Sequence, residues 1–128
     1  MSFYGTKSSK YAKDCYVPIK HYNNIKSNIT LGANTSAILL SDPKLILFTL
    51  SKYKFAGKHI NKSDIVLEIG CMDGFASLLL SSFCKELIAV DFYQSHIQDA
   101  KKYICEHVEN IEFKGLDFLE SEFDLEFD

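Results

Sequence analysis

The sequence contains no arginine, and lysine supplies all 14 of the side chains counted as Lys or Arg. Arginine is the side chain best suited to bidentate recognition of phosphate, so a common anchor for phosphate groups is missing. The formal net charge is −3, and the chain lacks the basic excess that marks a nucleic-acid footprint. These absences disfavour a nucleic acid as the partner.

Long apolar runs are also missing from the sequence. The longest, LILF at 45–48 and SLLL at 77–80, are far too short to cross a bilayer. The first thirteen residues, MSFYGTKSSKYAK, are polar and lysine-rich and do not resemble a signal peptide. We therefore expect a soluble, cytoplasmic protein without a membrane partner.

No two cysteines have the C-x-x-C spacing of a zinc or redox motif, and the histidines form no ligand-spaced set with them. This pattern favours reduced cysteines and no bound metal. The residues concerned are Cys15, Cys71, Cys84, Cys105, His21, His59, His96 and His107.

The length of 128 residues suffices for one small domain. Residues 1–40 are rich in tyrosine and lysine and have weak periodicity, so we interpret them as an N-terminal arm. A helix is predicted to follow, because Ser41 or Asp42 can cap it and Pro43 suits its first position. We assign residues 41–128 to the domain itself.

Three short apolar segments, 65–69, 86–92 and 111–117, predict strands, and the segments between them have helical patterns. Ser95 and Gln98 form a possible capping box for the helix over 96–107. Alternating strands and helices favour parallel pairing with right-handed crossovers. We therefore predict an incomplete Rossmann-like α/β fold, a three-layer parallel sheet with only its first three strands, and a helical N-terminal extension.

Ligands of parallel α/β sheets bind outside the carboxyl ends of the strands. Three groups fall there: the turn at 68–74, Asp91 after the second strand, and Asp117 after the third. Asp91 lies 21 residues beyond Gly70 (91 − 70), the spacing of an acid that binds ribose. Such a carboxylate can accept hydrogen bonds from both ribose hydroxyls.

The turn itself argues against a dinucleotide. Gly70, Met72 and Phe75 match the G-x-G-x-x-G fingerprint only once. Glu68 and Asp73 flank the turn, and no lysine lies within it, so anionic phosphates are disfavoured. A nucleoside without phosphates and with positive charge suits this turn better.

The segments VLEIGCMDGF, AVDF and GLDF, in this order and spacing, resemble motifs of the class I S-adenosylmethionine-dependent methyltransferases over roughly residues 31–128. The resemblance implies S-adenosylmethionine as the cofactor. It places the turn beside the methionine moiety, an acid at the ribose, an acid at the adenine amine, and a phenylalanine next to each acid. The implied contacts are Glu68, Gly70, Cys71 and Gly74 in the turn, then Asp91 with Phe92, then Asp117 with Phe118.

Met72 stands where this family has a glycine, so we expect its side chain to crowd the cofactor or shift the turn. The segment SDPKLILFTLSKYKF is similar to a helix of a bacterial subgroup associated with surface-polysaccharide genes. This likeness implies a methyl acceptor in surface-polysaccharide or small-molecule metabolism.

In the family, the acceptor side is built largely from the fourth strand onward. We expect only the first three strands in this sequence, so we nominate no catalytic base. The first strand would then have a free edge, which invites self-association or pairing with a complementary C-terminal half. Two alternatives stay open. The first alternative to a methyltransferase is an inactive truncated or split-gene fragment that acts at most as an interaction module. The second, less favoured, is a nicotinamide-cofactor protein.

Overall fold

The computed structural model describes residues 28–121 and 127 of the chain. Helices and strands alternate from residue 65 onward, as the sequence predicts. The elements are α2 (Ala33–Ser41), α3 (Lys44–Gly57), β1 (Ile65–Ile69), α4 (Ser77–Ser81), β2 (Glu86–Asp91), α5 (Gln94–Tyr103), the 3-10 helix η1 (Cys105–His107) and β3 (Ile111–Gly115).

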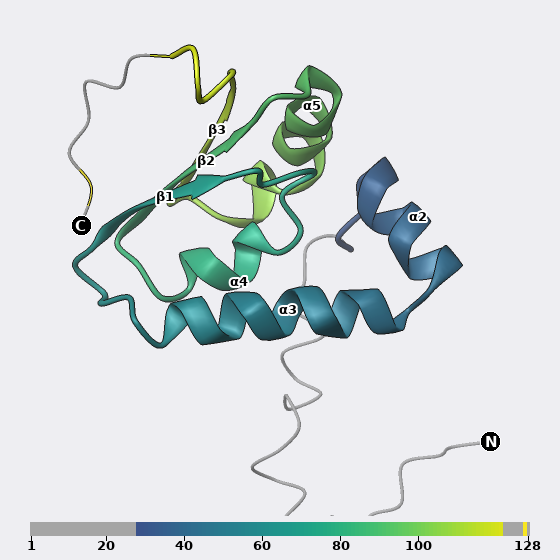
Figure 1. Cartoon of the computed structure of the whole chain (residues 1–128), viewed down its shortest axis with the longest axis horizontal. Helices are drawn as coiled ribbons and strands as arrows, with labels where there is room; N and C mark the ends of the chain where they lie inside the picture. Colours follow the sequence, from purple (N-terminus) through teal and green to yellow (C-terminus); the bar gives the residue numbers. More distant parts are fainter. Residues whose placement is uncertain (1–27, 122–126, 128) are drawn as a thin grey trace, which may run out of the picture.

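The three strands form one parallel sheet in the order β1-β2-β3, with β2 in the middle (Figure 1). The register pairs Ile69 with Val90 and Asp91 with Gly115, so the carboxyl ends of all three strands meet at one edge. Helices α2 and α3 precede β1. This arrangement confirms the predicted incomplete Rossmann-like fold with a helical N-terminal extension.

The hydrophobic core joins the sheet to α4 and α5. Leu87 and Ala89 of β2 are fully buried and pack in one cluster with Phe113 of β3, Leu80 of α4 and Ile97 of α5. Because side chains alternate along a strand, the cluster takes every second residue of β2. The core therefore fixes the positions at which β2 ends and α5 begins.

Helix α2 lies inside the segment that the sequence suggests is an arm, and its weak periodicity did not predict a helix. Two carboxylates from elsewhere in the chain hold its first turn. The Ala33 N–H donates to Asp99 Oδ2 at 2.8 Å, and the Thr35 N–H donates to Asp73 Oδ2 at 2.6 Å. Residues 1–27 lie outside the described residues, and the domain boundary at residue 41 stays a prediction.

The predicted capping box of Ser95 and Gln98 is wrong. Helix α5 begins at Gln94, so Ser95 already lies within its first turn. The N-cap residue is Tyr93, and its side chain makes no capping hydrogen bond. Asp91 binds the backbone just before the helix instead, because its Oδ1 accepts the Tyr93 N–H at 2.8 Å. The acid at the end of β2 thus also fixes the start of α5.

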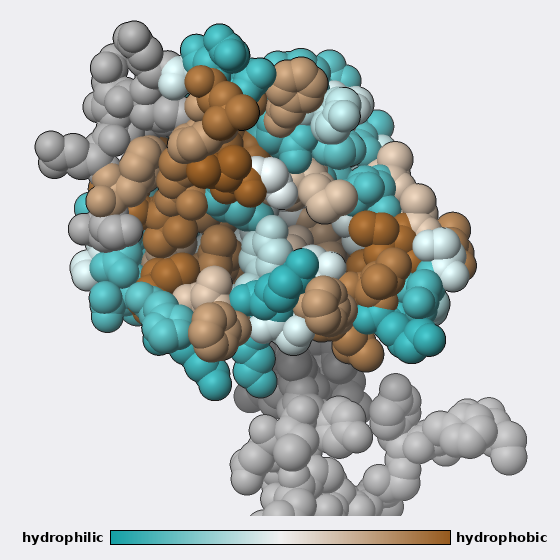
Figure 2. Space-filling view, viewed as in Figure 1, coloured by the Kyte–Doolittle hydropathy of each residue, from teal (hydrophilic) through white to brown (hydrophobic). Residues whose placement is uncertain are grey.

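Strand β1 pairs only with β2 among the described residues, so its other edge carries no strand there. Figure 2 shows apolar side chains gathered over β1 and the strands beside it. A groove of about 310 Å³ lies between this strand and α3, and its lining includes Val66, Leu67, Ile60 and Leu80. No helix of the described residues is long and apolar enough to cross a membrane.

Candidate functional site

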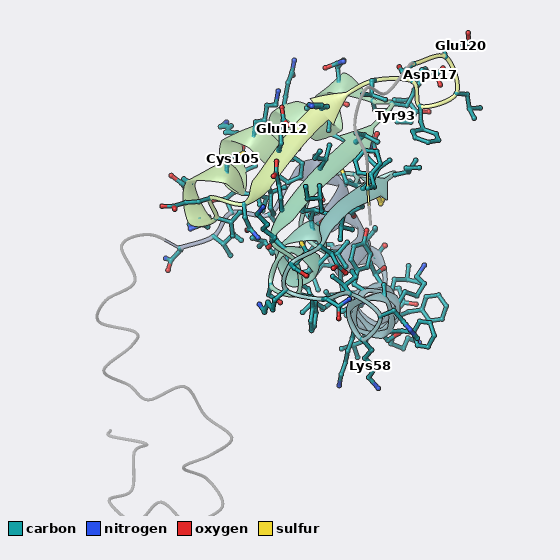
Figure 3. The ribbon with its side chains drawn as sticks, turned by 90° about the vertical axis from the view of Figure 1, so that its left-hand side faces the viewer. Lys58, Tyr93, Cys105, Glu112, Asp117 and Glu120 are labelled. Atoms are coloured by element: carbon teal, nitrogen blue, oxygen red, sulfur yellow. The ribbon has the colours of Figure 1, made fainter. Side chains whose placement is uncertain are left out.

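A pocket of about 370 Å³ opens at the carboxyl ends of the three strands. Tyr93 and Asp117 lie together at this end of the molecule, whereas Glu112 lies further back along β3 (Figure 3). Five of the eight residues predicted to contact a cofactor line the pocket: Gly70, Asp91, Phe92, Asp117 and Phe118. The parallel register brings these residues together, although they are spread over nearly fifty positions of the sequence.

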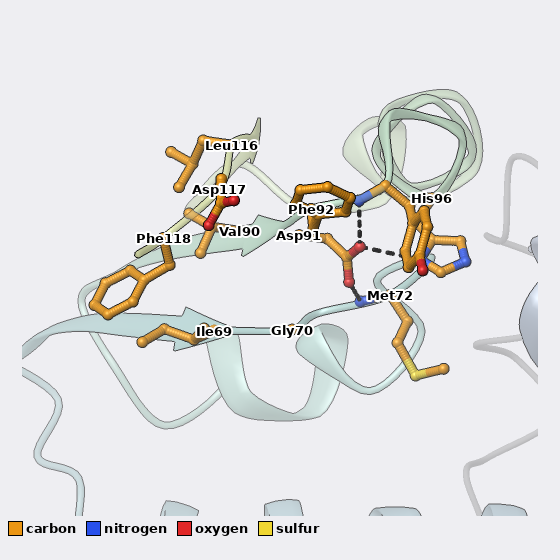
Figure 4. Close-up of a pocket in the computed structure, with 11 residues that line it drawn as sticks. Ile69, Gly70, Met72, Val90, Asp91, Phe92, His96, Leu116, Asp117 and Phe118 are labelled. Carbon is orange, nitrogen blue, oxygen red and sulfur yellow. Dashed lines mark hydrogen bonds and ion pairs between the residues drawn. The ribbon is translucent and has the colours of Figure 1, made fainter. Parts of the chain in front are cut away.

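Asp91 is the most extensively bonded group of the pocket, and only 7% of it is exposed. Its Oδ2 accepts the Met72 N–H at 2.8 Å, and its Oδ1 accepts the Tyr93 N–H at 2.8 Å (Figure 4). His96 Nδ1 lies 3.1 Å from the same Oδ1. Asp91 therefore ties the turn after β1 to the first turn of α5.

The turn after β1 has three residues with left-handed backbone: Gly70 at φ 80°, Met72 at φ 55° and Gly74 at φ 76°. Glycine adopts such angles readily, whereas a methionine there is strained. The Met72 Sδ lies 3.6 Å from Asn34 Nδ2 of α2, and the residue also lines the pocket. Its crowding of a cofactor stays a prediction.

Glu68 does not line the pocket at the strand ends; it is a buried anchor between elements. The Tyr53 hydroxyl of α3 donates to Oε1, and the Ser77 hydroxyl of α4 donates to Oε2 at 2.6 Å. Burial raises the pKa of Glu68, although these two hydrogen bonds oppose the shift. The predicted contact of Glu68 with the methionine moiety stays a prediction.

We expect Glu68→Gln to change how stability depends on pH. The folded pKa of Glu68 lies above its ordinary value of 4.5, so the folded state keeps a proton that the unfolded chain releases. The contribution of Glu68 to the free energy of unfolding should therefore be largest below pH 4.5 and be lost as pH rises through the folded pKa. Glutamine can satisfy both hydroxyls without titrating. Urea unfolding at several pH values should show that the free energy of unfolding of the variant rises relative to that of the wild type as pH increases. Parallel pH profiles of the two proteins would contradict this.

Cys71 and Gly74 also lie outside the pocket lining. Cys71 belongs to the hydrophobic core and is 3% exposed. Burial, followed by the nearby charge of Glu68, raises the pKa of its thiol, so the thiol is a packing group and a poor nucleophile. Gly74 packs beneath Phe113, where an added Cβ would lie 2.7 Å from the ring.

Sequence reasoning missed the two pocket residues with polar rings or hydroxyls, Tyr93 and His96, as well as the apolar Ile69, Val90 and Leu116. His96 faces Asp91 because α5 begins two positions before it. The signal available in the sequence is its position five residues after Asp91, which places it in the first turn of the following helix.

The charge of the pocket restricts its ligand. Two carboxylates, Asp91 and Asp117, line it together with the aromatic rings of Phe92 and Phe118. Its described lining contains no lysine. This combination favours a planar, phosphate-free group that donates hydrogen bonds or carries positive charge.

No family model matches the chain, and no curated protein matches it significantly. Solved structures do. A dimethyladenosine transferase from Plasmodium falciparum matches with a TM-score of 0.54 and 37% identity over 62% of this chain. The YcgJ protein from Bacillus subtilis has a TM-score of 0.51 and 25% identity over 59% of this chain. A putative methyltransferase from Haloferax volcanii has a TM-score of 0.51 at 18% identity over 70% of this chain.

The matched region is a small part of each of these proteins. The chain covers 28% of the Plasmodium protein, 32% of the Bacillus protein and 37% of the Haloferax protein. The described part of the chain therefore has an incomplete form of the fold of the class I S-adenosylmethionine-dependent methyltransferases.

Proposed function

We propose that the chain is the cofactor-binding part of an S-adenosylmethionine-dependent methyltransferase. The observation that carries this proposal is the position of Asp91 at the end of β2 and of Asp117 just beyond the end of the adjacent strand β3. Both line a pocket whose described lining contains two phenylalanines and no lysine. S-adenosylmethionine matches this donor set, because it has ribose hydroxyls, an adenine amine, a sulfonium and an ammonium group.

Each pocket residue has a role that its contacts allow. Asp91 has about four acceptor positions, of which its three neighbours use three, so one is left for a ribose hydroxyl. Asp117 Oδ1 accepts the Leu119 N–H at 3.0 Å, which leaves its second oxygen for the adenine amine. Phe92, 63% exposed, offers its ring to the adenine face.

The cofactor supplies an activated methyl group on a sulfonium leaving group. The protein contributes alignment, which is worth up to ~7–11 kcal/mol of the barrier when both reactants are held in line. The residues described above hold the cofactor side of that alignment.

The methyl acceptor belongs to surface-polysaccharide or small-molecule metabolism in this proposal, because the segment 41–55 is similar to a helix of the bacterial subgroup named above.

Calorimetric titration tests the proposed cofactor. We expect the purified chain to bind S-adenosylmethionine and S-adenosylhomocysteine and to give no heat with NAD. Binding of NAD alone would favour a nicotinamide-cofactor protein. If none of the three binds to the folded chain, the proposal fails and the interaction-module alternative takes its place.

One edge of β1 pairs with no strand among the described residues, and this supports a further part of the proposal, that the strand pairs with a second copy or with a complementary C-terminal half. An apolar strand at the edge of a sheet invites such pairing. The groove beside β1 would be covered by the same contact.

For the chain alone, we expect self-association that grows with concentration, measured by light scattering after size exclusion. Leu67→Lys places a charge on β1 and should shift the chain towards monomer. The matched control is Leu119→Lys, because Leu119 is 89% exposed and lies outside the sheet. A wild-type chain that stays a monodisperse monomer at every concentration would contradict pairing between copies.

A further inference from the structure

The environment of Asp91 differs from that of a carboxylate free to accept two ribose hydroxyls. Its Oδ1 faces two donors, the Tyr93 N–H at 2.8 Å and His96 Nδ1 at 3.1 Å. Its Oδ2 accepts one, the Met72 N–H at 2.8 Å. Since a carboxylate oxygen has two lone pairs, Oδ1 is saturated and a single acceptor position is left, on Oδ2.

The role of His96 follows from this count. A carboxylate can only accept a hydrogen bond, so a hydrogen bond across the 3.1 Å contact takes its proton from Nδ1 of the imidazole. The two backbone donors belong to the fold itself, whereas the third donor is a side chain. His96 is therefore the residue whose identity decides whether Oδ1 keeps an open acceptor position.

The imidazole of His96 is held in place by its surroundings. The Tyr93 ring packs against it, with ring centroids 5.3 Å apart and an angle of 63° between the planes. The backbone N–H of His96 donates to the Tyr93 carbonyl at 3.1 Å, which fixes the residue in the first turn of α5. In Figure 4, His96 lies on the α5 side of Asp91, and Asp117 and Phe118 lie on the opposite side. His96 also lines the pocket, so the acceptor position that its imidazole occupies on Oδ1 faces the space of the ligand.

We propose that His96 is a specificity-determining residue that limits Asp91 to a single ribose hydroxyl, accepted on Oδ2. The inference rests on the proposed function, because it concerns the same pocket and the same ligand. The second ribose hydroxyl then donates its hydrogen bond to another acceptor or to water. This refines the expectation from sequence that the carboxylate binds both hydroxyls together.

The test combines ligand and protein changes in double-mutant cycles. S-adenosylhomocysteine and its 2′-deoxy and 3′-deoxy analogues are titrated into the wild type and into Asp91→Asn, which isolates the coupling of Asp91 with each hydroxyl. In the wild type we expect the coupling of Asp91 with one hydroxyl to be roughly tenfold in affinity, which corresponds to about 1.4 kcal/mol. We expect no coupling with the other hydroxyl.

The same cycles in His96 variants test the role of the imidazole. His96→Leu, which has no donor, should open Oδ1 and create coupling with both hydroxyls. His96→Asn places an amide donor near the position of Nδ1 and should restore coupling with one hydroxyl only. A merely structural role of the ring would not produce this difference between the two variants.

Each result decides a different claim. Coupling of Asp91 with both hydroxyls in the wild type would overturn the inference, and so would identical coupling in wild type and His96→Leu. Coupling with neither hydroxyl, in a chain that binds S-adenosylhomocysteine, would move the ribose away from Asp91. Absence of any binding by the folded wild type would instead overturn the proposed function.

Discussion

Asp91→Asn should weaken the binding of S-adenosylhomocysteine about 10- to 100-fold, because hydrogen bonds to a charged group are worth about 1.5–3 kcal/mol. The variant keeps the size of the side chain but replaces one acceptor oxygen with an amide donor. That donor must face the Met72 N–H, the Tyr93 N–H or a ribose hydroxyl of the ligand. In each case a hydrogen bond that the carboxylate accepted is lost, because two donors then face each other. Calorimetric titration of wild type and variant measures the difference.

Glu112→Gln is the matched control for this substitution. It removes the same charge, but Glu112 is paired with Lys114 on β3 at 3.0 Å and lies away from the pocket (Figure 3). Its affinity for the cofactor should equal that of the wild type. Circular dichroism checks that both variants are folded. If folded Asp91→Asn bound with wild-type affinity, the ribose would not lie at Asp91.

Gly74→Ala should lower the free energy of unfolding by about 2–5 kcal/mol, the largest effect on stability that we predict. The left-handed backbone at φ 76° contributes about 1–2 kcal/mol for a residue with a Cβ. That Cβ would also lie 2.7 Å from the Phe113 ring and 3.0 Å from Ala100 Cβ. Forcing such a contact in a packed core costs about 1–3 kcal/mol more. Urea unfolding measures the total.

Gly70→Ala separates the two causes. Gly70 has nearly the same backbone angle, φ 80°, but an added Cβ there meets no atom within 4 Å. Its cost should therefore be the backbone part alone, about 1–2 kcal/mol. Equal losses of stability in the two variants would show that Phe113 and Ala100 move aside freely, contrary to the core packing described above.

The strands and their order along the chain could be predicted from the sequence, and the structure confirms them. Short apolar runs separated by helical patterns leave few alternatives to parallel pairing, and parallel pairing fixes the edge at which ligands bind. The positions of Asp91 and Asp117 at that edge follow directly. Local patterns were sufficient because the alternation of short apolar segments with helical segments can be seen in residues close together in the sequence.

Contacts between distant residues could not be predicted in the same way. Helix α2 depends on Asp73 and Asp99, which lie 38 and 66 positions from the N–H groups that they accept. The burial of Glu68 between Tyr53 and Ser77 likewise depends on how α3 and α4 pack against β1. A sequence pattern shows that an acid follows or ends a strand, but it does not show which donors surround that acid.

Sequence patterns were enough to predict the parallel sheet, the edge that carries the pocket, and the two carboxylates and two phenylalanines gathered there. How those carboxylates are used became visible in the folded chain. Glu68 turned inward to two hydroxyls, and Asp91 received a third donor from His96. The physical reason is that periodicity encodes which side of an element is buried, whereas hydrogen-bond partners are set by the packing of elements against one another.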